Sequence, residues 1–67
     1  MAATSDKDRA QNAVDDAFEI AVQGLFRVLD RELKDNPAEA TARFEAGLGH
    51  LKAVRDKATA SVGKALS

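Results

Sequence analysis

The sequence predicts an all-α fold, in which two long antiparallel helices form a hairpin that dimerises into a four-helix bundle. Apolar residues recur at helical spacing along nearly the whole chain of 67 residues. The clear interruption is Asp35-Asn36-Pro37, which can end one helix and begin another. A chain this short has little interior of its own, and it has no cysteine for a disulfide. A second copy is therefore expected to complete the core.

The first helix is expected from about residue 5 to residue 35. Ser5 is suited to cap it, with Asp8 three residues further on. Asp6 and Asp8 also place negative charge at the positive end of the helix dipole. Gly24 lies inside this helix and costs about 1 kcal/mol relative to alanine, which weakens the helix without ending it.

The second helix is expected over residues 37–65. Asn36 is a favourable N-cap, Pro37 fits the first helical position and Glu39 fits the third. A turn as short as Asp35–Pro37 makes the two helices antiparallel neighbours. Residues 1–67 are therefore expected to form a single domain.

The first helix carries more apolar surface than a lone hairpin needs. One stripe is bulky and is expected to face the second helix: Val14, Phe18, Val22, Leu25, Leu29 and Leu33, with Phe26 at its margin. A second stripe beside it is built mainly of small residues: Ala10, Ala13, Ala17, Ala21, Gly24 and Val28, with Ile20 at its outer edge. This second stripe is interpreted either as the dimer interface or as a groove for a helix of another protein.

The second helix has one main apolar stripe, and a charged residue lies within it. The stripe contains Ala40, Phe44, Gly47, Leu48, Leu51, Val54, Ala58, Val62, Ala65 and Leu66. By helical angle Arg55 falls in the middle of this stripe, where an unpaired charge is costly. We expect Arg55 to pair with Asp15 or Glu19, within the hairpin or across the dimer.

Two glycines are expected at the same level of the hairpin. Facing residues have numbers that sum to about 71 if the chain turns at Asp35-Asn36, and this places Gly24 opposite Gly47. The pair is interpreted as a site of close helix approach, as a notch for Phe26 or Phe44, or as a ligand slot.

Charge is unevenly distributed between the helices. Residues 5–35 contain eight acidic and five basic side chains, whereas residues 36–67 contain three and five. Four basic residues recur every seven positions on the second helix, and we call them the basic line: Arg43, His50, Lys57 and Lys64. The basic line is interpreted as a solvated flank that pairs with the acidic helix, or as a contact for nucleic acid or an acidic protein.

The residue types do not favour chemistry. One histidine and no cysteine cannot build a zinc site, and the acidic cluster Asp15, Asp16 and Glu19 lacks the further ligands of a metal site. We expect no catalytic residues, no metal and no cofactor, and hence no enzyme. The N-terminal residues lack the apolar core of a signal peptide, and no apolar run is long enough to span a membrane. A soluble cytoplasmic protein without a membrane partner is expected.

The function expected from these patterns is that of a small adaptor or regulator, which homodimerises and binds another protein through an apolar helical surface. In length and layout the predicted hairpin resembles the Rop-type RNA-modulating hairpins and the small hairpin co-chaperones of secretion systems. That resemblance implies the alternative, a Rop-like RNA-binding dimer that uses the basic line. The near balance of ten basic and eleven acidic side chains makes nucleic acid the less favoured partner.

Overall fold

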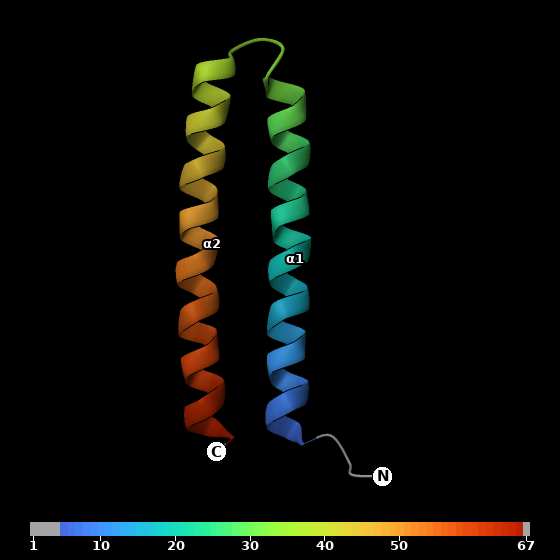
Figure 1. The fold of residues 1–67 in the computed structure, drawn as a ribbon, viewed down its shortest axis with the longest axis vertical. Helices are drawn as coiled ribbons and strands as arrows, with labels where there is room; N and C mark the ends of the chain where they lie inside the picture. The colour runs from blue at the N-terminus through green and yellow to red at the C-terminus, as the bar shows by residue number, and fades with distance from the viewer. Residues whose placement is uncertain (1–4, 67) are drawn as a thin grey trace.

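The computed structural model describes residues 5–66, which form two antiparallel helices packed side by side (Figure 1). Helix α1 is Asp6–Glu32 and helix α2 is Pro37–Ala65. The molecule extends 51 × 23 × 10 Å. A thickness of one helix means that the hairpin is a single layer, so both of its broad faces are open to solvent.

Both helices begin with the caps that their sequences predict. The Ser5 hydroxyl accepts a hydrogen bond from the Asp8 backbone N–H at 3.1 Å. At the start of α2, the Asn36 side chain accepts a bond from the Glu39 backbone N–H at 3.4 Å and donates one to the Glu39 carboxylate at 2.8 Å. These bonds satisfy backbone donors that have no partner inside a helix.

Removal of the second cap should weaken the hairpin measurably. Asn36→Ala is expected to lower the free energy of unfolding by about 1 kcal/mol, because the Glu39 N–H loses its acceptor. The matched control is Asn12→Ala, at an exposed position inside α1, which should be neutral or slightly stabilising. Urea unfolding followed by circular dichroism measures both. Equal effects of the two substitutions would mean that Asn36 does not act as a cap.

The first helix ends earlier than the sequence predicts. It stops at Glu32, and residues 33–35 form the turn instead of a last helical turn. The Glu32 carbonyl accepts bonds from the backbone N–H groups of both Asp35 and Asn36, each at 3.1 Å. These two bonds close the reversal, and Asn36 then takes a non-helical conformation (φ −148°, ψ 79°), as a residue before proline requires.

The seam between the helices is only partly shielded from solvent. Among residues 5–66, only Ala40 is buried, at 2% exposure. The other apolar residues of the seam are half-buried: Val14, Phe18, Ala21, Val22, Leu25 and Leu29 on α1, with Phe44, Leu48, Leu51, Ala58 and Val62 on α2. Leu33 was expected in this seam but is 40% exposed, because it lies beyond the end of α1. One layer of two helices therefore has no closed core.

The two glycines do not act as a pair. A Cβ atom built on Gly47 would lie 2.9 Å from both Cδ atoms of Leu25, so Gly47 is the notch, and it receives Leu25 instead of Phe26 or Phe44. A Cβ atom on Gly24 would meet nothing within 4 Å. The expectation of glycine facing glycine is thus wrong, because Gly24 lies on the flank of α1 and not on its seam side.

The space around each glycine predicts different gains from alanine at Gly47 and Gly49. Gly49→Ala should stabilise the hairpin by about 1 kcal/mol, since alanine favours helix and a Cβ atom there meets nothing within 4 Å. Gly47→Ala should stabilise the hairpin much less, because the Leu25 side chain must move to admit the methyl group. Thermal unfolding of both variants checks this. An equal gain at the two positions would show that Leu25 does not occupy the notch.

Candidate interaction surface

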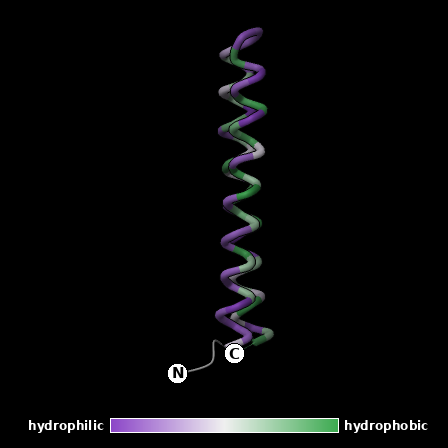
Figure 2. The backbone as a smooth tube through the Cα atoms, turned by 90° about the vertical axis from the view of Figure 1, so that its right-hand side faces the viewer, coloured by the Kyte–Doolittle hydropathy of each residue, from purple (hydrophilic) through white to green (hydrophobic). Residues whose placement is uncertain are grey.

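The second apolar stripe of α1 lies open on one broad face of the hairpin. We call this surface the small-residue face: Ala13, Ala17, Ile20, Gly24 and Val28 of α1 together with Val54 of α2. Ile20 is 67% exposed and Val28 is 39% exposed. Figure 2 views the hairpin edge-on, and over most of its length hydrophobic segments follow one edge while hydrophilic segments follow the other. The hairpin thus presents one apolar face and one polar face.

A shallow apolar groove runs along the small-residue face between the two helices. Its volume is about 260 Å³, and its lining includes Ala17 and Ala21 of α1 with Val54 and Ala58 of α2. Val54 was expected inside the stripe of α2 that faces α1, but it is 49% exposed. The helical angle explains this, because Val54 lies at the edge of the stripe nearest the open face.

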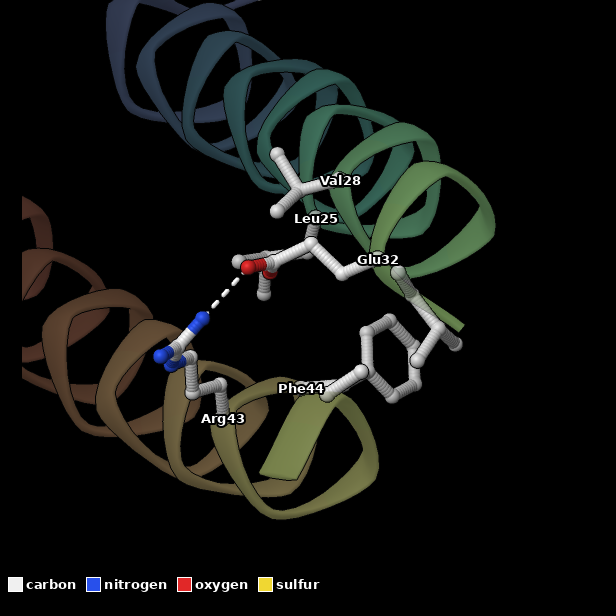
Figure 3. A pocket seen from close by; sticks show the side chains of 7 residues that line it. Leu25, Val28, Glu32, Arg43 and Phe44 are labelled. Carbon is white, nitrogen blue, oxygen red and sulfur yellow. Dashed lines mark hydrogen bonds and ion pairs between the residues drawn. The ribbon is translucent and has the colours of Figure 1, made fainter. Parts of the chain in front are cut away.

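Near the turn, one end of the small-residue face is closed by an ion pair between the helices. Arg43 binds Glu32 of α1 and Glu39 of its own helix. Figure 3 shows the Glu32 carboxylate directed at Arg43, with Val28 and Phe44 beside them around a small hollow. Both partners are partly exposed, so each pair stabilises the hairpin by well under 1 kcal/mol.

The basic line lies along the edge of α2 that borders the small-residue face. All four of its residues are exposed. Arg43 is engaged by two carboxylates, which matches the interpretation of a flank that pairs with the acidic helix. His50, Lys57 and Lys64 form no ion pair with other residues of the described range 5–66. A nucleic-acid contact through all four residues would require Arg43 to give up both of its partners.

Arg55 does not form the expected ion pair within the hairpin. Its guanidinium lies over the ring of Phe18, 4.5 Å from the centroid, and 3.7 Å from the carboxylate of Asp56 on the same helix. Asp15 instead accepts a hydrogen bond from Gln11 at 3.2 Å, and Gln11 also donates to Thr59 of α2 at 3.0 Å. The aromatic face and the Asp56 carboxylate together compensate the charge in place of Asp15 or Glu19. A pairing of Arg55 with Asp15 or Glu19 across a dimer stays a prediction.

Asp56 is the carboxylate whose charged form is stabilised by the ion pairs within α2. A hydrogen bond from Lys52, at 3.0 Å, holds the pKa of Asp56 below its usual value, and the charge of Arg55 acts in the same direction. A lowered pKa means that any contribution of Asp56 to stability is present at neutral pH and is lost as the pH falls through the folded-state pKa. Because the Asp56 side chain is exposed to solvent, the contribution is small.

The opposite broad face is acidic and carries an exposed aromatic residue. We call it the acidic face: Asp15, Glu19, Phe26 and Asp30 of α1 with Glu45 of α2. Phe26 is 60% exposed, and a shallow hollow lies beside it between Val22 and Arg27. The sequence analysis placed Phe26 only at the margin of a stripe. Its alignment with Glu19, seven residues earlier, and Asp30, four residues later, was the signal that this surface is distinct.

Comparison with known proteins identifies no relative: no family model, no curated protein and no solved structure matches this chain. Within the described residues, no helix is both long and apolar enough to cross a membrane. The same part of the chain contains no cluster of three or more histidine, aspartate or glutamate side chains placed to hold a metal ion.

Proposed function

We propose that this hairpin is a small, non-enzymatic protein–protein interaction module whose first partner is a second copy of itself. The small-residue face carries the proposal, because it presents a long apolar surface that the single chain leaves uncovered. Ile20 at 67% exposure and Val54 at 49% would each gain by burial against another helix. Small residues at Ala13, Ala17 and Gly24 would allow that helix to approach closely.

A second hairpin packed against this face would form a four-helix bundle and cover the seam that one layer leaves open. In such a bundle the half-buried residues of the seam would lie between two layers of helices. The resulting dimer would serve as an adaptor or regulator, whose remaining surfaces contact other proteins.

Concentration dependence tests this proposal directly. Sedimentation equilibrium should give a mass of about twice the 7.1 kDa of one chain, or more, at high concentration. The melting temperature should rise with protein concentration, because association stabilises only the folded state. A folded chain that stays at 7.1 kDa and melts at the same temperature at every concentration would refute self-association.

A further inference from the structure

The two broad faces of the hairpin differ in charge as well as in polarity. The small-residue face is bordered on α2 by Lys57 and Lys64. The acidic face carries its carboxylates on nearly the opposite side of α1, roughly 150° away at 100° per residue. Lys57 and Lys64 therefore form a basic rim along the α2 edge of the small-residue face, whereas the acidic face carries four carboxylates together with Lys52, which lies seven residues after Glu45.

Within residues 5–66, Lys57, Lys64 and the carboxylates of the acidic face take part in no ion pair, although Asp15 accepts a hydrogen bond from Gln11. Among residues 5–66, the ion pairs join Arg43 to Glu32 and Glu39, and Lys52 and Arg55 to Asp56. None of these pairs uses the four carboxylates of the acidic face, which are Asp15, Glu19, Asp30 and Glu45. None uses Lys57 or Lys64 either. The two sets are complementary in sign and are available for contacts between copies.

The apolar features of the two faces are complementary as well. Phe26 projects from the acidic face with 60% of its surface exposed. The groove beside Ala17 and Val54 has a volume of about 260 Å³. An apolar cavity of about 150 Å³ is large enough to hold a benzene ring, so the groove has room for a phenyl side chain.

We infer that a second copy covers the small-residue face with its acidic face, so that Phe26 of one copy enters the groove of the next and its carboxylates meet the basic rim. This inference rests on the proposed self-association and specifies which surfaces meet. Contact between two small-residue faces would instead bring two basic rims together, which opposes association. Pairing of unlike faces is heterologous, so each pair leaves one face of either kind free and further copies can add.

Salt dependence distinguishes the two arrangements without any substitution. When unlike faces meet, opposite charges attract, so self-association should weaken about tenfold between about 50 mM and about 500 mM sodium chloride. When like faces meet, salt screens a repulsion, and association should strengthen or stay unchanged. Sedimentation equilibrium at the two salt concentrations measures the difference. Stronger or unchanged association at high salt would overturn the inference.

Mixing two variants provides a second test. Ala17→Glu blocks the small-residue face and keeps the acidic face, whereas Phe26→Glu does the reverse. Each variant alone should remain at 7.1 kDa, and an equimolar mixture should form a discrete pair of about twice that mass. Both positions are exposed, and glutamate favours helix, so both variants should fold. Circular dichroism checks that both variants fold. The same experiment with Ala17→Gln and Phe26→Gln tests the two faces without an added charge.

The outcomes separate the inference from the proposed function. If Phe26→Glu still forms a closed dimer by itself while Ala17→Glu does not, like faces meet, and the inference is wrong although self-association stands. If neither variant alters the association of the unchanged chain, neither face is the interface, and both proposals fail. Monomeric variants that pair only when mixed would support the contact between unlike faces.

Discussion

Phe18→Ala is expected to remove most of the stability of the hairpin and to lower its melting temperature sharply. Phe18 is half-buried in the seam, and its ring also carries the Arg55 guanidinium at 4.5 Å. Truncation of a fully buried phenylalanine costs about 3–5 kcal/mol, and about 2–3 kcal/mol is expected for this half-buried one. Domains below about 70 residues rarely have more than about 3–5 kcal/mol of stability in total, so the loss is comparable to the whole. Far-UV circular dichroism during heating measures it.

The matched control is the same substitution at the exposed phenylalanine. Phe26→Ala should leave the melting curve at low protein concentration unchanged, because the Phe26 side chain makes little contact within one chain. The substitution should only reduce the rise in melting temperature that accompanies an increase in protein concentration. Arg55→Met is a second control, and it should be nearly neutral because methionine retains the apolar stem beside Phe18. If Phe26→Ala destabilised the dilute protein as much as Phe18→Ala, the seam would be assigned to the wrong side of α1.

Ala17→Glu is expected to abolish self-association while leaving the helices intact. Ala17 is exposed in the single hairpin and lines the groove of the small-residue face. A carboxylate there would have to lose its water against the apolar surface of an incoming helix, at a cost of about 3 kcal/mol or more. That corresponds to an association at least about a hundredfold weaker. Sedimentation equilibrium gives the dissociation constant.

Ala53→Glu is the control for this second prediction. It introduces the same charge and the same helix former at an exposed position on the side of α2 away from α1, so it should associate as the unchanged chain does. If both variants weakened self-association equally, the added net charge would be the cause. If both variants associated as strongly as the unchanged chain, the small-residue face would be excluded as the interface.

Local features of this chain could be read from its sequence because short-range interactions determine them. Asn36 and Pro37 start a helix in almost any surroundings, since the cap uses only Glu39 nearby and proline restricts only the residue before it. The separation of a bulky stripe from a small-residue stripe on α1 follows from the helical repeat alone. The exposed faces could therefore be listed, although Phe26 and the acidic residues in line with it were not recognised as a surface of their own.

The tertiary structure decided which sector of each helix faces the other. A stripe on a helix covers a wide angle, and only packing against the neighbour determines which part of it becomes the seam. Gly47 receives Leu25 while Gly24 faces open space, and Val54 lies on the open face although it belongs to the apolar stripe of α2. Arg55 likewise contacts the Phe18 ring and Asp56, whereas Asp15 is bound by Gln11, which also reaches Thr59 of α2. A rotation of a few tens of degrees about either axis would keep every sequence pattern and change each of these contacts.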